Sequence, residues 1–580
     1  MNTSSTPAIV AQGAVRRLPR RVLMLLCAIY VLAGFLGREP WKNADIAAFG
    51  YMAELAGMHG GTGADSHWFA PSLLGLPPEV DALLPYWLGA FAIQAFSPWM
   101  APELAARIPF MLMLASTLAS TWYAVYYLAR SPLAQPVAFA FGGEAQPADY
   151  ARAVADGGLL ALLATLGLAQ LSHEVTPALA QLSCVAGFFY ACAALRYRTV
   201  WPAVVGATAL FSLALSGAPV VAVLLGIGNV ALLLLQREPL DPAAAADGVV
   251  GRRSRWLAIG LALLTCAVIA GVSTLALWRW RIVLPTAAGF EWGALSRLLL
   301  WFTWPAWPLA LWTLWRWRGQ LLGGQPSWHL ALPLWFVALP MGVAVGAGGS
   351  DRALLLALPA LAALAAFALP TLRRSMAALI DWFTLLFFTG CAAVIWFLWV
   401  AMQTGVPSRP AANVARQVPG FVAQFDLWLF ALALIATLTW GWLVRWRVGR
   451  HRAAIWKTLV LPAGGAVLCW LLLTTLWLPL FDYARSYGAL VQRVAKVVQQ
   501  PSCVEVAGLT RAQVAAFRFH GKLELQPAAG FASCPWLLVD ADALRKFAAG
   551  TIDPTTWELH ARFRRPGDNN EEVLLYRRRA

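Results

Sequence analysis

The sequence predicts an all-α polytopic membrane protein with a small α+β domain at its C-terminal end. Of its 580 residues, 60% are hydrophobic and only 12% are charged, whereas a soluble domain usually carries about 25% charged residues. The apolar residues extend from about residue 22 to about residue 480, after which charged residues return. These features exclude soluble, fibrous and disordered proteins.

The apolar runs are long enough for about thirteen transmembrane helices, because a helix needs about 20 apolar residues to cross the hydrocarbon core. The boundaries near residues 173 and 217 are open, since two runs follow each other there with almost no loop. The expected spans are 22–37, 104–128, 156–172, 175–195, 201–217, 218–236, 256–278, 294–315, 328–347, 353–370, 378–401, 422–444 and 455–479.

Basic clusters between these runs indicate the orientation, since basic residues gather in cytoplasmic loops. They predict a cytoplasmic N-terminus, and an odd number of spans then places the C-terminal domain in the periplasm of a bacterial inner membrane. The same bias explains the net charge of +16 without a nucleic-acid partner. The clusters comprise Arg16, Arg17, Arg20, Arg21, Arg196, Arg198, Arg252, Arg253, Arg255, Arg316, Arg318, Arg373, Arg374, Arg445, Arg447, Arg450 and Arg452.

The chain divides into a membrane domain, residues 1–479, and a soluble domain, residues 480–580. The membrane domain contains a long first outward loop, residues 38–103. Its amphipathic stretches Asp45–Met58 and Tyr86–Phe96 should lie along the membrane surface rather than cross it.

In the C-terminal domain, short apolar runs at Pro535–Val539 and Val573–Tyr576 predict strands, and Thr510–Phe519 predicts a helix. Of eight cysteines, only Cys503 and Cys534 lie in this domain. An oxidising periplasm favours a disulfide between them; the alternative is two unpaired thiols.

Acidic residues are scarce in the apolar body, so those at the outward ends of spans are candidate site residues. Asp45 follows the first span at the start of a predicted helix, where the helix dipole favours a carboxylate. The alternative is that Asp45 is only an N-cap or a first-turn acid of this helix. His173 and Glu174 lie in a tight turn between two spans; the alternative is a solvated hairpin turn.

A third outward position pairs Asp351 with Arg352. A guanidinium binds phosphate oxygens in a bidentate manner, so Arg352 could meet a lipid phosphate; the alternative is a local salt bridge with Asp351. Arg279 and Arg281, at the outward end of the seventh span, offer the same chemistry or contact lipid headgroups.

The first loop also contains His59, Asp65 and His67, but their spacing matches no compact metal-ligand motif. No metal ligand and no cofactor is therefore assigned, and the sequence leaves a divalent metal open. Walker, GxGxxG, GxSxG and HExxH motifs are absent, so nucleotide-driven work and serine or zinc hydrolysis lack support.

Several motifs resemble, in order, those of the GT-C glycosyltransferases. The most similar group uses polyprenyl-phosphate sugars and contains the lipid A aminoarabinose transferases and the protein O-mannosyltransferases. The segments that carry the resemblance are Asp45–Phe49, Trp68–Pro77, Pro85–Trp87, Ala106–Pro109 and Asp351–Pro359.

The sequence also departs from the pattern of this family. Ile46 replaces the acid after Asp45, and Asp81 stands near the position of a lysine. Ser216–Pro219 replaces a second lysine segment. In relatives these lysines are thought to help hold the lipid phosphate.

The resemblance implies an inverting transfer in which a carboxylate deprotonates the acceptor hydroxyl. Asp45 is the expected base, and Glu174, with His173, should position the acceptor or the sugar. Arg352, Arg281 and Lys42 are expected at the departing phosphate.

Tyr86 and Arg107, within the matching motifs, are further candidate substrate-binding residues. The implied function is the transfer of a sugar from undecaprenyl phosphate to lipid A, another glycolipid, a glycan or a protein. The alternatives are a transporter or lipid flippase, and a degenerate family member that acts as a scaffold.

Overall fold

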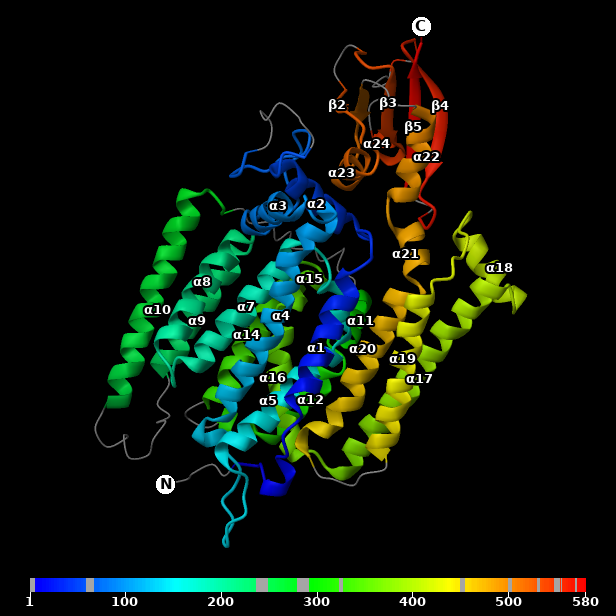
Figure 1. Cartoon of the computed structure of the whole chain (residues 1–580). Coiled ribbons are helices and arrows are strands. Elements are labelled where there is room, and N and C mark those ends of the chain that lie inside the picture. Colours follow the sequence, from blue (N-terminus) through cyan, green and yellow to red (C-terminus); the bar gives the residue numbers. More distant parts are fainter. Residues whose placement is uncertain are drawn as a thin grey trace.

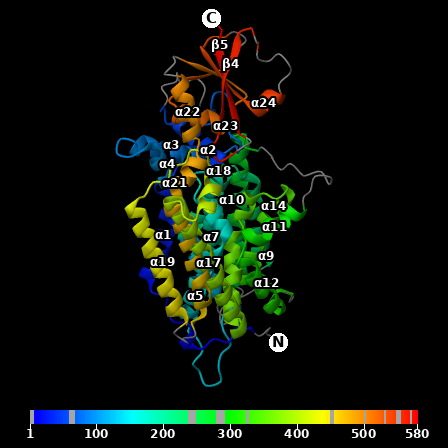
Figure 2. The same cartoon turned by 90° about the vertical axis from the view of Figure 1, so that its right-hand side faces the viewer.

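The computed structural model consists of a long helical body with a small sheet domain at one end (Figures 1 and 2). The N-terminus and the C-terminal domain lie at opposite ends of the body (Figure 1). This arrangement confirms the predicted fold class. The structure describes residues 6–58, 67–235, 249–278, 292–322, 327–448, 454–498, 503–528, 532–546, 553, 555–568 and 571–579.

The body is built from long apolar helices and from shorter helices between them. Among the described residues, seven helices are long and apolar enough to cross a membrane, and several other apolar helices are shorter. The count of thirteen therefore stays a prediction. The helices of the body are α1 (Arg20–Phe35), α4 (Pro102–Ala129), α5 (Pro147–Ala164), α6 (Leu166–Leu171), α7 (Pro177–Ala194), α8 (Val200–Leu215), α9 (Pro219–Leu235), α10 (Val249–Thr274), α11 (Trp292–Phe302), α12 (Ala306–Arg316), α13 (Arg318–Leu321), α14 (Trp328–Gly346), α15 (Asp351–Leu355), α16 (Leu358–Ala368), α17 (Arg374–Thr404), α19 (Leu427–Val448) and α20 (Val460–Leu476).

Three predicted spans are each broken into two helices: α5 and α6, α11 and α12, and α15 and α16. Two of the breaks meet, because the Leu166 amide donates a hydrogen bond to the Trp304 carbonyl at 3.1 Å. The hydroxyl of Thr165 donates to the Leu162 carbonyl at 2.6 Å. Backbone groups freed inside a membrane need such partners within the protein, so each break supports the other.

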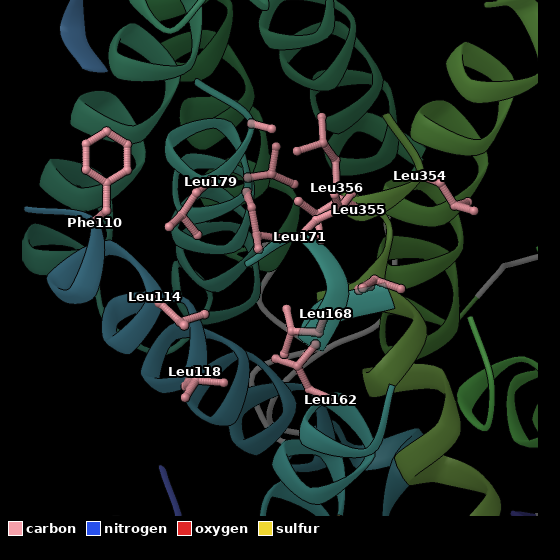
Figure 3. Packing of buried hydrophobic residues seen from close by; sticks show 14 of the residues in the cluster. Phe110, Leu114, Leu118, Leu162, Leu168, Leu171, Leu179, Leu354, Leu355 and Leu356 are labelled. Atoms are coloured by element: carbon pink, nitrogen blue, oxygen red, sulfur yellow. The ribbon is translucent and has the colours of Figure 1, made fainter. Parts of the chain in front are cut away.

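The centre of the body lies around α5, α7 and α16, whose side chains are almost all buried. Apolar side chains from α4, from the end of α5, from α6, from the start of α7 and from the end of α15 pack near one another (Figure 3). The residues labelled there are Phe110, Leu114, Leu118, Leu162, Leu168, Leu171, Leu179, Leu354, Leu355 and Leu356.

Helices α17 and α19 lie at the edge of the body (Figure 1) and expose large apolar side chains such as Trp382, Leu386, Trp428 and Trp442. Their inward faces pack on α20. An apolar outer face combined with a packed inner face suits helices that contact lipid.

An outward layer of helices covers the end of the body nearest the C-terminus (Figure 1). As predicted, the first outward loop contains two helices, α2 (Asn43–Leu55) and α3 (Leu84–Phe96). The other helices of this layer are α18 (Ser408–Gln417), α21 (Leu478–Arg485) and α22 (Gly488–Val498).

The C-terminal domain contains a five-stranded mixed sheet in the order β2-β1-β3-β5-β4. Strand β1 runs parallel to β2 and β3, whereas β5 runs antiparallel to β3 and β4. The predicted strands and helix correspond to β3, β5 and α23. The elements are β1 (Val504–Ala507), α23 (Arg511–Phe519), β2 (Leu525–Pro527), β3 (Trp536–Asp540), α24 (Ala541–Lys546), β4 (Trp557–Arg564) and β5 (Glu572–Arg578).

The predicted disulfide is confirmed: Cys503 and Cys534 are bonded, with 5.4 Å between their Cα atoms. The bond joins the start of β1 to the approach to β3, which are neighbours in the sheet. It closes a loop with a sequence separation of 31 residues.

Removing this disulfide should destabilise the C-terminal domain. The variant Cys503→Ser/Cys534→Ser should lose about 3–4 kcal/mol of unfolding free energy, because the cross-link limits the freedom of the unfolded chain. Thermal unfolding of the two proteins, followed by limited proteolysis within residues 503–579, measures the loss. Equal melting of this region in both proteins would contradict the prediction.

Candidate functional site

The first turn of α2 carries the carboxylate of Asp45, which is buried with 1% of its surface exposed. Oδ2 accepts a hydrogen bond from Arg38 Nη2 at 3.0 Å, and Oδ1 accepts one from the Val175 amide at 2.8 Å. A buried charge is tolerated only when it is paired and hydrogen-bonded. Asp45 is a first-turn acid and not the N-cap of α2, and its hydrogen bonds to Arg38 and Val175 give it contacts beyond its own helix.

The turn between α6 and α7 presents His173 to the interior of the body. Its ring stacks on Trp470, with 4.7 Å between centroids, and also contacts Tyr30 and Phe35. Burial lowers the pKa of His173 to about 3, so the ring is neutral at physiological pH. Its Nε2 lies 2.9 Å from the Tyr30 carbonyl oxygen; since a carbonyl only accepts, Nε2 carries the proton.

Helix α1 passes close to His173 because Gly34 lies at the crossing point. A side chain at Gly34 would overlap the imidazole ring. The close approach explains why a residue without a side chain stands here. It also brings the end of α1, and with it Arg38, to the turn.

Glu174, in the same turn, is buried and forms an ion pair with Lys42. The Nζ of Lys42 also donates a hydrogen bond to the Gln170 carbonyl at 3.2 Å. Burial raises the pKa of Glu174, while the charges of Lys42 and Arg352 act in the opposite direction. The solvated hairpin considered as an alternative is therefore wrong.

Arg38 joins the first loop to this turn, since it donates hydrogen bonds to Asp45 and to the His173 carbonyl. Two segments far apart in sequence, 38–45 and 172–176, thus form one polar centre. The sequence alone predicts no role for Arg38. The only available signal was its position at the end of the first span, next to a predicted acid.

Arg107 is buried in α4 and donates a hydrogen bond to the Phe35 carbonyl at 3.0 Å. It thereby holds the end of α1 in place.

A cavity of about 840 Å³ adjoins the polar centre. Helix α2 presents Asn43, Ala44, Ala47, Ala48 and Tyr51 to it, a spacing that marks one face of a helix. Asp45 lies on the other face and does not line the cavity, nor do Glu174, His173 or Arg107. The polar and charged residues around the cavity are Asn43, Tyr51, Glu79, Asp81, Tyr86, Thr176, Gln181, Ser350, Arg352, Thr510 and Arg511.

Two predicted binding residues, Tyr86 and Arg352, lie in the wall of this cavity. Arg352 is half-buried in α15, and within the described ranges its guanidinium forms no ion pair with Asp351 or with any other acid. The charge of Arg352 acts on both Glu174 and Tyr86. A half-buried cation that faces a cavity without an acid partner can bind an anion.

The C-terminal domain completes the wall of the cavity with Thr510, Arg511 and Ala512 at the start of α23. Arg511 Nε donates a hydrogen bond to the Pro77 carbonyl at 2.7 Å. Helix α23 packs directly on α2, where a side chain at Gly50 would overlap Ala515.

Four residues singled out in the sequence, Arg279, Arg281, His59 and Asp65, lie outside the described residues. His67 is described, at the start of a short turn that follows them. Within the part of the chain that the structure describes, no group of three His, Cys, Asp or Glu residues could hold a metal ion.

Asp482, in α21, anchors the segment that connects α1 to α2. Its Oδ1 accepts hydrogen bonds from the Glu39 amide, at 3.0 Å, and from the Trp41 indole. Burial raises its pKa from 3.8 to about 6. Between about pH 4 and about pH 6, the folded protein therefore holds a proton on Asp482 that the unfolded chain releases. The stability that this proton contributes falls as the pH rises through that range.

The variant Asp482→Asn should remove this pH dependence, because the amide oxygen still accepts both hydrogen bonds without burying a charge. Relative to wild type, its melting temperature should rise more at about pH 8 than at about pH 4.5. Thermal unfolding in detergent at both pH values measures the difference, with the exposed Glu558→Gln as control. An equal shift at both pH values would refute the assignment.

No family model and no curated protein matches the sequence. Among solved structures, ArnT from Cupriavidus metallidurans is similar, both bound to undecaprenyl phosphate and in the apo state, with TM-scores of 0.57 and 0.54. Each alignment covers 96% of this chain and 98% of the ArnT chain at 14% identity. The oligosaccharyltransferase AglB from Archaeoglobus fulgidus matches with a TM-score of 0.39 and 12% identity, over 90% of this chain and 69% of its own. The likeness to ArnT shows that the chain has the fold of that protein over nearly its whole length.

Proposed function

We propose that this protein is a membrane glycosyltransferase that moves a sugar from a polyprenyl phosphate to an acceptor at the outward face of the membrane. The observation that carries the proposal is the position of Arg352. Its guanidinium, without an acid partner among the described residues, faces a large cavity beside a centre of two carboxylates, Asp45 and Glu174. The ArnT fold supports this assignment.

The wall of the cavity nearest the helical body is apolar and suits a lipid-linked donor. Val221, Leu277, Val343 and Leu356 line it, from the ends of membrane helices or just beyond them. A polyprenyl chain would lie against these side chains, with its phosphate at Arg352. The similar ArnT structure bound to undecaprenyl phosphate supports a lipid of this class.

In the proposed reaction, a carboxylate takes the proton of the acceptor hydroxyl as its oxygen attacks the anomeric carbon. The bond between that carbon and the phosphate oxygen breaks, and the phosphate leaves as an anion that Arg352 stabilises. The configuration of the sugar is inverted.

Asp45 is our candidate for the base. A carboxylate offers about four acceptor sites, and Arg38 and Val175 occupy two of those of Asp45. Neither of these two partners lines the cavity. Hydrogen bonds of catalytic groups, however, often align only in the complex with substrate.

The remaining predicted residues take supporting roles in this proposal. Glu174 and Lys42 form the polar edge of the centre and position the sugar or the phosphate, and Tyr86 contributes a ring to the cavity wall. His173 and Arg107 are buried and hold α1 and the turn in place.

We further propose the orientation and the domain division that the basic clusters and the composition indicate. Residues 1–479 would form the membrane domain, with a cytoplasmic N-terminus in a bacterial inner membrane. Residues 480–580 would form the periplasmic domain, which faces the acceptor. Lipid A, another glycolipid, a glycan and a protein remain the candidate acceptors.

A transfer assay with purified protein tests the reaction and its base. A panel of radiolabelled polyprenyl-phosphate sugars is offered to an extracted pool of membrane lipids, glycans and proteins. Wild type should transfer label, and Asp45→Asn should be slower by about 100-fold or more, because a general base contributes about 100- to 10,000-fold. Glu174→Gln should be slower by a smaller factor.

Each outcome of this assay separates the alternatives, provided that the variants elute as single species and melt like wild type. Full activity of Asp45→Asn together with an inactive Glu174→Gln would move the base to Glu174. If folded wild type transfers no sugar from any donor, the proposed function is wrong, and a transporter, a flippase or a scaffold takes its place.

The phosphate role of Arg352 is tested by lipid binding rather than turnover. The variant Arg352→Gln should bind polyprenyl phosphate about 10- to 100-fold more weakly than wild type, since a charge-assisted contact contributes about 1.5–3 kcal/mol. The matched control is Arg374→Gln, an exposed arginine at the other end of the body. Equal weakening in both variants would indicate nonspecific attraction of the lipid.

A further inference from the structure

Arg565, in the turn between β4 and β5, is a charged residue of the C-terminal domain that the proposed chemistry does not use. It is buried, with 8% of its surface exposed. Its Nη1 donates a hydrogen bond to Asn43 Oδ1 at 3.1 Å and to Glu571 Oε2 at 2.9 Å. Its Nη2 donates to the Trp41 carbonyl at 3.3 Å. One guanidinium thus holds the first residue of α2 and the chain just before it.

Asn43 is that first residue, two positions before Asp45, and other groups of the C-terminal region bind its side chain as well. Its amide donates a hydrogen bond to Glu571 Oε1 at 3.0 Å, and its oxygen also accepts one from the Tyr487 hydroxyl at 3.2 Å. The guanidinium of Arg565 lies over the Tyr487 ring, 4.6 Å from its centroid. Among the described residues, every hydrogen bond of this side chain comes from residues beyond 480.

The turn that carries Arg565 is itself held against the helical body. Arg565 donates a further hydrogen bond to the Arg485 carbonyl at the end of α21. A side chain at Gly567 would overlap the Ala484 carbonyl, so the turn and α21 are in direct backbone contact. Helix α21 follows α20 with no intervening loop, and the body therefore fixes the position of the guanidinium.

The far end of α2 makes a separate contact with the same domain. Glu54 forms an ion pair with Arg518 of α23 at 2.7 Å, and Phe49 packs edge-on against Phe519. Loss of Arg518 would weaken the docking of the domain without freeing the first turn of α2. Variants of Arg518 and Arg565 therefore distinguish the docking of the domain from the positioning of Asp45.

We infer that Arg565 is a positioning residue, through which the C-terminal domain fixes the first turn of α2 and so the direction of the Asp45 carboxylate. The inference rests on the proposed function for its catalytic consequence. Its structural part does not: the Asp45 carboxylate accepts the hydrogen bond of the Val175 amide, and that amide reports on the position of Asp45 whether or not sugar is transferred.

The kinetic test compares Arg565→Ala, Arg565→Lys and Arg518→Ala in the full-length protein. Arg565→Ala should lower kcat by about 10-fold or more with little change in the KM of the donor, because small displacements of a catalytic group are costly. The kcat of Arg565→Lys should lie between those of wild type and Arg565→Ala, since an ammonium cannot hold both segments as the forked guanidinium does. Arg518→Ala should keep kcat within about two-fold of wild type, because the ion pair of Arg518 with Glu54 lies at the end of α2 far from Asp45.

The structural test measures hydrogen exchange of the peptide that contains Val175. Exchange of its amide should be faster in Arg565→Ala than in wild type, and unchanged in Arg518→Ala. If Arg565→Ala does not purify as a single species, Arg565→Lys carries both measurements.

Unchanged exchange at Val175 in the Arg565 variants would overturn the inference, as would equal losses of kcat in Arg565→Ala and Arg518→Ala. Inactive wild type would instead overturn the proposed function. In that case the exchange measurement still decides whether Arg565 positions Asp45.

Discussion

The buried ion pair between Arg38 and Asp45 is the interaction on which the end of the body nearest the C-terminal domain depends. Two charges removed from water need good geometry and further hydrogen bonds, or their desolvation outweighs their attraction. Here the Val175 amide and the His173 carbonyl supply those partners. Since these groups come from the turn between α6 and α7, burial of Asp45 requires that α1, α2 and this turn meet in one arrangement.

The absence of water inside a membrane explains why the broken helices occur in contact with one another. A break frees backbone groups that lipid cannot satisfy, and the hydrogen bond from Leu166 to Trp304 shows how one break serves the other. The breaks leave α6 and α15 short. The turn that follows α6 and the turn that precedes α15 therefore lie close to the body. This places His173, Glu174 and Arg352 at the level of the first-loop helices.

The cavity belongs to both domains, which gives the C-terminal domain a part in any reaction that occurs there. The helical body supplies an apolar wall and Arg352, whereas α23 supplies Arg511 on the other side. The proposed lipid donor and a polar acceptor need such different walls. The contacts of Arg565 hold the first residue of α2, Asn43, which also lines the cavity.

Composition and periodicity predicted the fold class and the two helices of the first loop. The redox chemistry of a periplasm favoured the disulfide of the C-terminal domain over two unpaired thiols. Asp45, Glu174 and Arg352 were candidates because charged residues are scarce at the ends of apolar runs, whereas Tyr86 came from a motif of the family resemblance.

Only the tertiary structure decided which of these residues face the cavity and which face the interior. Tyr86 and Arg352 line the cavity, whereas Asp45 turns toward Arg38 and His173 is packed among aromatic rings. The role of Arg565 could not be predicted at all. Two of its partners, Trp41 and Asn43, lie more than five hundred positions earlier in the chain, and no local pattern records a contact that exists only once two domains have packed together.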